Sequence, residues 1–509
     1  MKSEALHDSG ADLAMVIRRH PWLVISTSLV AVCAITFVWL DWRAEKRWQR
    51  YAADARARDV KLVLADFALP EIPDAENFAA LPMFHAPLTN GKKTIPFTLP
   101  EVPSDRTGPG HNIYETPTTH PSPKLGNPFL GTKTDWVEWQ TYFRDAKFLT
   151  APSDNPPADV VRALEHFAPE FQQWNEWRTR PRARPYEAVG DVAIEFTIGT
   201  QFAARVFALR MQAHLALGDL AAARADFENG LQGYRALKDH PVVEGMTRLA
   251  ILSVLIPRLG EGFQGHHWSD ADCQAIQEML ASIRVCDDWR LMLSSTRGEF
   301  NTLFDAWAGA SIPERKQLII DRIYYHSPPS DPAVYTLSMI PLGMIRDNQL
   351  RENQYVDELL ARIDSTAQTI DLRRKTPSSI ENITNPQETY RYMLIRLCGA
   401  AYSGMERRHI AVKTLVDEAQ LACALERFRY AHGSYPETLT ELVPAFIAQL
   451  PIDIDAGAGY RYQRVGNTSF RLYGVGPNGQ DDGGQPAIGV PEQKQLDAIW
   501  IYAPPVDTP

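Results

Sequence analysis

The hydrophobic pattern near the start of the chain is dominated by one uninterrupted apolar run. Residues 22–40 carry no charge, and a helix of this length spans about 28 Å, close to the thickness of a bilayer's hydrocarbon core. Trp22 and Trp39 stand near its ends, where indole rings favour the membrane interface. Charged residues 41–47 follow, in place of the small residues of a signal-peptide cleavage site. The run predicts an uncleaved transmembrane helix; a cleaved signal peptide or a buried core helix are the alternatives.

The next two stretches have contrasting patterns. Residues 41–68 are rich in Ala, Arg and Lys, which predicts that the membrane helix continues as a stem. From residue 70 to residue 128 twelve prolines interrupt the chain. Proline fixes φ and lacks an N–H donor, so this stretch is expected to be extended, without long helices or central strands.

Helical periodicity then runs through most of the chain. It is clearest over residues 204–237, where Gly218 is predicted to cap one helix before the next begins. Ser269 is expected to cap a further helix through Ile276 and Leu280. A long helix is predicted from Pro386 to residue 431, softened near a solvated turn at residues 406–408.

The C-terminal pattern changes to strands. Proline at position 436 ends the long helix, and residues 460–463 and 470–473 alternate apolar and polar side chains across a turn at residues 466–469. This spacing predicts a β-hairpin, with residues 497–502 as a closing strand.

These patterns predict a mainly α fold divided into consecutive parts. They are a tail (1–20), a transmembrane helix (21–41), a helical stem (42–68), a proline-rich extended segment (69–130), an α-helical domain (131–385), a long helix (386–431) and a small α+β head (432–509).

Composition limits the kinds of ligand that the protein is expected to bind. The chain has 509 residues and a net charge of −10, and no basic tract carries interleaved aromatics, so we expect no nucleic-acid binding. The cysteines are scattered without a C-x-x-C pair, which argues against a zinc ribbon. His266 and His267 with Cys273 are expected to form a polar turn instead of a metal site.

Candidate catalytic chemistry is sparse. The chain lacks G-x-S-x-G, a phosphate-binding G-x-x-x-x-G-K-[ST] loop and H-E-x-x-H. We therefore expect a protein that is not an enzyme; the alternative is a membrane-tethered hydrolase whose catalytic residues are dispersed over the helical domain. Tryptophans at i and i+3 are expected to pack in the core, a carbohydrate platform being the alternative: Trp136, Trp139, Trp174 and Trp177.

Two stretches resemble known families. Residues 204–237 resemble a tetratricopeptide repeat, with Gly230 in place of the repeat's later alanine; the matching positions are Phe207, Ala213, Gly218, Ala223 and Phe227. Residues 416–502 resemble the globular head of the G-type major pseudopilin of type II secretion. The order of elements carries this resemblance: a helix ending in His432-Gly433-Ser434-Tyr435-Pro436, short strands, and the loop at residues 474–484.

The pseudopilin resemblance implies a calcium site in that loop. Calcium prefers six to eight oxygen ligands on a flexible loop. The residues at the matching positions are Asn478, Asp481, Asp482 and Asp497. A hairpin loop with solvated acids explains the same residues, and Asn478 is neutral where the family has an acid.

Together these features predict a single-pass protein of the bacterial inner membrane, with its large domain in the periplasm. We expect an envelope scaffold that binds protein partners, associated with a secretion-like or pilus-like assembly. Arg18 and Arg19 precede the apolar run, while Arg43, Lys46, Arg47 and Arg50 follow it, so the positive-inside rule read literally favours the opposite orientation.

Overall fold

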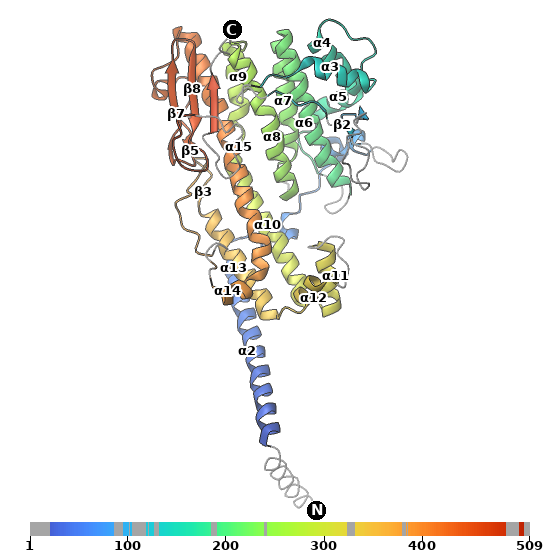
Figure 1. The fold of residues 1–509 in the computed structure, drawn as a ribbon, viewed down its shortest axis with the longest axis vertical. Coiled ribbons are helices and arrows are strands. Elements are labelled where there is room, and N and C mark those ends of the chain that lie inside the picture. The colour runs from blue at the N-terminus through green and yellow to red at the C-terminus, as the bar shows by residue number, and fades with distance from the viewer. Residues whose placement is uncertain are drawn as a thin grey trace, which may run out of the picture. The chain divides into compact units, whose positions relative to one another are not determined.

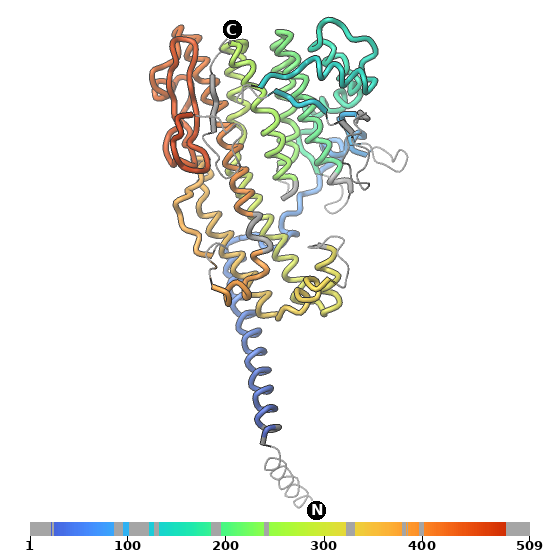
Figure 2. Tube along the Cα trace, in the orientation of Figure 1, coloured from blue at the N-terminus to red at the C-terminus, as the bar shows by residue number. Residues whose placement is uncertain are grey.

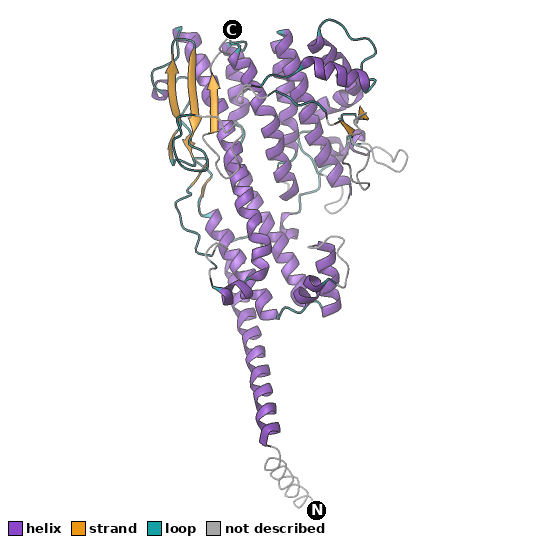
Figure 3. Cartoon of the chain, viewed as in Figure 1, coloured by secondary structure: helices purple, strands orange, loops and turns teal. Residues whose placement is uncertain are grey.

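The structure is a computed structural model that is mainly helical, with short strands (Figure 3). It describes residues 21–85, 95–100, 102–103, 119–120, 122–126, 132–184, 191–238, 242–322, 331–378, 383, 385–484 and 498–502. The chain forms two compact units. Unit 1 combines residues up to 66 with 297–358 and 376–400, and unit 2 combines 67–296, 359–375 and 401–509. Each unit joins segments distant in sequence, whereas the expected parts were consecutive.

Unit 1 is a helical assembly around a small apolar core. Its core side chains include Phe304, Trp307, Ile345 and Leu394. Its helices are α2 (Pro21–Ala57), α11 (Ile312–Arg322), α12 (Pro332–Ser338), α13 (Leu342–Leu360) and α14 (Pro386–Arg391), together with the part of α10 (Val285–Gly309) from Arg297 onward and the start of α15 (Met393–His432). A short 3-10 helix, η1 (Leu64–Phe67), follows α2.

Helix α2 confirms one N-terminal helix long and apolar enough to cross a membrane, and its apolar window is fully exposed. The expected stem is shorter than predicted, because α2 ends at Ala57 instead of continuing to residue 68. Asp59 adopts a left-handed φ of 55°, and the Val60 N–H donates to the Ala55 carbonyl at 3.0 Å. This pairing satisfies the last helical carbonyls and turns the chain.

Unit 2 holds the larger core. Its N-terminal part contains η2 (Asp74–Glu76), η3 (Phe78–Ala80), η4 (Pro82–His85), β1 (Val102–Pro103) and β2 (Thr119–His120), the last two paired antiparallel. Helices α3 (Trp136–Asp145), α4 (Pro156–Leu164) and α5 (Ala168–Trp174) follow, with η6 (Glu165–Phe167) and η7 (Asn175–Arg178). Phe78, Phe84 and Phe97 from the proline-rich stretch are buried in this core. Trp139 and Trp174 are also buried, as the core interpretation predicted.

Three helices of unit 2 pack side by side: α6 (Asp191–Leu217), α7 (Leu220–Ala236) and α8 (Val242–Gln264) (Figure 2). The predicted cap is confirmed, since Gly218 has a φ of 76° and Asp219 then caps α7. Gly230 lets α7 approach α8 closely: a Cβ there would meet Leu255 Cδ2 at 2.6 Å. Helix α9 (Asp270–Ala281) follows, capped by Ser269 as predicted. The first part of α10 continues the helical part of unit 2.

Helix α15 runs unbroken from Met393 to His432, and α14 precedes it from Pro386. The turn predicted at residues 406–408 is wrong, because these residues lie within α15, whereas Arg407 and Arg408 are exposed to solvent as expected. Glu406 is largely buried and forms an ion pair with Arg362 at 3.1 Å. Arg362 directly precedes β3 (Ile363–Asp364), which pairs with β4 (Thr369–Ile370), and this contact shields Glu406 from solvent.

The C-terminal strands confirm the predicted hairpin. Strands β7 (Arg461–Val465) and β8 (Ser469–Gly474) pair antiparallel, and β9 (Ala498–Tyr502) adds to β8 as the closing strand. A second small sheet pairs β5 (Ile452–Asp453) with β6 (Ala458–Gly459), after η9 (Leu439–Leu442). Phe470 and Leu472 of β8 join the same apolar core as Leu421 and Leu425 of α15.

Candidate functional site

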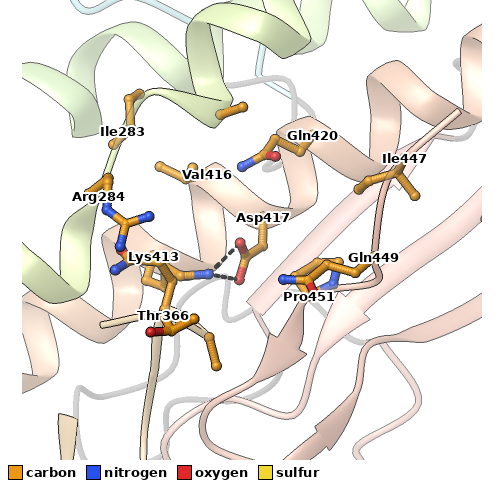
Figure 4. A pocket seen from close by; sticks show the side chains of 13 residues that line it. Ile283, Arg284, Thr366, Lys413, Val416, Asp417, Gln420, Ile447, Gln449 and Pro451 are labelled. Atoms are coloured by element: carbon orange, nitrogen blue, oxygen red, sulfur yellow. Dashed lines mark hydrogen bonds and ion pairs between the residues drawn. The ribbon is translucent and has the colours of Figure 1, made fainter. Parts of the chain in front are cut away.

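A cavity of about 180 Å³ lies in unit 2 beside helix α15. Its wall combines the turn between α9 and α10, the β3–β4 turn, one face of α15 and the segment 447–451 before β5 (Figure 4). The lining residues used below are Arg284, Lys413, Asp417, Gln420 and Gln449. Four separate segments of the chain therefore converge on one polar hollow.

A buried ion pair forms the floor of this cavity. Lys413 Nζ donates to both carboxylate oxygens of Asp417, one helical turn later, at 2.5 Å. The Tyr460 hydroxyl donates to the same carboxylate at 3.0 Å and accepts from Thr414. Burial raises the pKa of Asp417, opposed by the charge of Lys413. Lys413 and Asp417 bond to each other, and Tyr460, which lies between β6 and β7, holds this face of α15 beside the two strands. The pair presents a polar surface to the cavity.

Acidic groups crowd the far side of this pair. Asp453 is buried and accepts the Val475 N–H at 2.9 Å. Glu418 is fully buried, accepts from the Gly474 backbone, and its Oε1 has no hydrogen-bond partner. Burial, with Asp417 and Asp453 nearby, raises the pKa of Glu418 well above its usual value. Burial therefore favours the protonated form of Glu418.

The rim of the cavity presents hydrogen-bonding groups to solvent. Arg284, Gln420 and Gln449 are arranged around the ion pair (Figure 4). Arg284 bonds through Nε to Asp287 at 2.5 Å and through Nη2 to the Ser365 carbonyl. The side-chain amides of Gln420 and Gln449 make no hydrogen bond to another described residue. Each amide offers a donor and an acceptor, which suits a ligand that itself carries both.

A second cavity, of about 340 Å³, adjoins the first. The two share Ala281, Gln420, Ile447 and Gln449 in their walls. The second cavity also includes Gln274, Gln277 and Arg427, which lie on α9 and α15. Gln277 donates to the Phe446 carbonyl at 2.9 Å and accepts from Arg427 at 3.0 Å, holding the 444–449 segment against both helices. Together the cavities form a glutamine-lined surface on two sides of residues 447–449.

The predicted calcium ligands are only partly described. Asp497 lies outside the described residues. Asn478 donates to Asp482 at 2.7 Å, while Asp481 accepts from Arg461 and Tyr473, each at 3.0 Å. The N–H of Gly483 and the other donors lower the pKa of Asp481. Within the described ranges no three His, Cys, Asp or Glu side chains converge as a metal site, and calcium binding stays a prediction.

The histidine pair lies in a turn, as expected. His266 has a left-handed φ of 52°, and its Nδ1 is 3.5 Å from the Glu426 carboxylate. Glu426 in turn accepts hydrogen bonds from Arg429 and Tyr435. The buried cysteines Cys273, Cys286 and Cys423 are free thiols, and burial raises the thiol pKa of each.

Sequence reasoning missed the glutamine-lined surface. A signal was present, because Lys413 and Asp417 stand four residues apart within an otherwise apolar stripe of α15. Charges in such a stripe require buried partners. Gln449 and Arg284 gave no comparable signal, because they join α15 only through the tertiary fold.

Comparisons of the chain with protein-family models, with curated proteins and with solved structures found no match.

Proposed function

We propose that the protein is a membrane-anchored scaffold of the bacterial envelope that binds an extended segment of a partner protein. The anchor is α2, whose first half is apolar and exposed. Its second half is tied to unit 1, since Arg47 pairs with Asp347 and Tyr51 donates to Asp357 at 2.8 Å. The span and its domain are therefore joined by a rigid helix and not by a flexible linker.

The glutamine-lined surface is the observation that carries the binding proposal. An extended peptide presents alternating N–H and C=O groups, and the free amides of Gln420 and Gln449 match both kinds. The neighbouring charges are already paired, so the surface selects hydrogen-bonding groups over a strongly charged ligand. Two adjoining cavities on either side of residues 447–449 provide places for side chains of such a peptide.

The resemblances supply the wider setting of this proposal. Helices α6 and α7 form a repeat-like hairpin. Arg210 of α6 links the two helices, because its Nε donates to both carboxylate oxygens of Asp226 of α7, at 2.9 and 3.0 Å. The pseudopilin-like head would place the scaffold at a secretion-like or pilus-like assembly, on the periplasmic side of the inner membrane. Calcium in the loop at Asn478, Asp481 and Asp482 would stiffen that head. The alternative, a tethered hydrolase, needs a nucleophile beside a free base; in this cavity Lys413 is paired with Asp417 and does not supply that base.

Site-specific photo-crosslinking in native membranes tests the scaffold proposal. A photoreactive phenylalanine replaces Gln449 in the full-length protein, and Gln274 in a second variant. Both positions line the second cavity, so both are expected to capture the same protein. The matched control places the same photoreactive residue at the exposed Val465 of β7.

The crosslinked species are identified by mass spectrometry, with and without a calcium chelator. A common partner at residues 449 and 274, absent at 465 and reduced by Gln420→Ala, supports the proposal. Capture of different proteins at the two cavity positions, or the same capture at 465, contradicts it. Loss of capture on chelation would assign the calcium loop a role in the same interaction.

A further inference from the structure

The end of the apolar run is fixed against other elements of unit 1. Asp41 is the first charged residue after that run. Its Oδ1 accepts the backbone N–H of Gly343, at the start of α13, at 2.7 Å. Four residues later Glu45 accepts from Arg346 Nε, also at 2.7 Å. With α2 as the proposed span, the start of α13 lies at the depth where this helix leaves the bilayer.

Several elements at this end of unit 1 carry exposed apolar side chains. Outside α2, the large hydrophobic residues that are exposed in the described part of unit 1 are Ile312 (43%), Tyr335 (54%), Met339 (51%) and Tyr390 (64%). They lie on α11, on α12, in the α12–α13 turn and on α14, at the end of unit 1 from which α2 projects (Figure 1). Met339 precedes Gly343 by only four residues, in the turn between α12 and α13.

Ion pairs hold α14 at the same end. Asp347, one turn into α13, pairs with Arg47 of α2 and with Arg391 of α14. Arg391, which follows Tyr390 in α14, is therefore linked to α2 through one carboxylate. On α11, the Lys316 ammonium lies 4.2 Å from the ring centre of Tyr335 on α12. Aromatic side chains beside cations are typical of surfaces that rest at the headgroup level of a membrane.

We infer that Ile312, Tyr335, Met339 and Tyr390 form a second membrane contact, which rests on the surface of the leaflet next to the emerging α2. Tyr335, Tyr390 and Met339 enter the interfacial layer, and Lys316 faces the phosphate groups of anionic phospholipids. Continuity with α2 selects the bilayer as the occupant, because the start of α13, which follows the α12–α13 turn, is hydrogen-bonded to the end of the apolar run. The inference rests on the proposed span. It makes unit 1 a domain seated on the membrane and not a domain held above it.

Lipid quenching of a fluorescent label tests this contact in the full-length protein. Single cysteines are introduced by Met339→Cys or Tyr335→Cys, in a Cys33→Ser/Cys398→Ser background, and labelled with bimane. Cys273, Cys286 and Cys423 are buried, so they label poorly. The control, Asp54→Cys, lies on α2 about 20 Å beyond Asp41 and is exposed. The protein is placed in phosphatidylcholine–phosphatidylglycerol vesicles that contain doxyl-labelled lipid.

The expected result is strong doxyl quenching at positions 335 and 339 and little at position 54. Ile312→Ser/Tyr390→Ser should weaken quenching at 339 while the protein stays in the carbonate-resistant membrane fraction. Equal, weak quenching at all three positions overturns the contact. Shielding from aqueous iodide without doxyl quenching identifies a second copy of the chain as the occupant and also overturns it. Release of the protein by carbonate would instead show that the span itself is wrong.

Discussion

At the scale of single residues, the chain keeps several ionisable groups away from water, and each constrains how stability varies with pH. Glu418 has a raised pKa because it is buried near Asp417 and Asp453. His409 behaves oppositely: it is buried against Trp289, with ring centres 4.7 Å apart, and burial lowers its pKa to about 4. Its neutral form is therefore the folded form, and acid destabilises the protein through it.

Replacing Glu418 by glutamine should stabilise unit 2 above about pH 4.5. The folded state holds a proton on Glu418 that the unfolded chain loses near its usual pKa, so stability falls as pH rises from there to the folded pKa. One such proton gives a slope of about 1.4 kcal/mol per pH unit. Glutamine keeps the acceptor for Gly474 without that proton. Urea unfolding at pH 5 and pH 8 measures the difference.

The matched control for this prediction is Glu71→Gln, because the Glu71 side chain is 93% exposed. It should leave the pH dependence of unfolding as in the parent protein. If the Glu418→Gln variant lost as much stability as the parent protein between pH 5 and pH 8, Glu418 would be ionised in the folded state.

At the scale of elements, glycine decides how closely helices approach. Gly230 faces Leu255 across the α7–α8 contact, and the space there holds no Cβ. Gly404 lies inside α15, and a Cβ there would meet nothing within 4 Å. The two positions therefore separate the packing effect of a methyl group from its effect on helix propensity.

Gly230→Ala should destabilise unit 2 by about 1–3 kcal/mol, because the new methyl group forces Leu255 out of its position. Gly404→Ala is the matched control and should stabilise α15 by about 0.5–1 kcal/mol through helix propensity. Chemical denaturation followed by circular dichroism measures both. A stabilised Gly230→Ala variant would mean that α7 and α8 are further apart than in this structure.

The elements also show where sequence reasoning worked and where it failed. The Gly218 cap, the Ser269 cap and the β7–β8 hairpin follow from local signals, and all three are present. The helix end at Ala57 was missed because Asp59 adopts a left-handed conformation that is less common for Asp than for Gly. The burial of Glu406 was missed because Arg362, its partner, is distant in sequence.

At the scale of the whole molecule, helix α2 of unit 1 stands out among the described residues, because its apolar side chains are exposed over a long stretch. Val30 and Ile35 of α2 are 68% and 69% exposed and contact no core. Their apolar character does not stabilise the folded units. A bilayer gives these side chains the environment that the folded chain does not provide.

The double substitution Val30→Arg/Ile35→Arg should release the protein from membranes. Each arginine near the centre of the span costs about 2.5–3.5 kcal/mol of insertion free energy. The folded units should keep their melting temperature, since neither side chain packs on them. Carbonate extraction followed by immunoblotting measures retention, with Val30→Leu/Ile35→Leu as the control. Full retention of the arginine variant would exclude α2 as the anchor.

The unbroken course of α2 has a rotational consequence. The helix turns about 100° per residue. Asp41 and Glu45, which bind Gly343 and Arg346, therefore fix the rotation of the proposed span about its own axis relative to unit 1. One residue added between positions 40 and 41 would swing the apolar span by that angle relative to unit 1 while lengthening it by only about 1.5 Å. In the proposed membrane-spanning arrangement, helical phase therefore sets the direction in which unit 1 faces within the membrane plane.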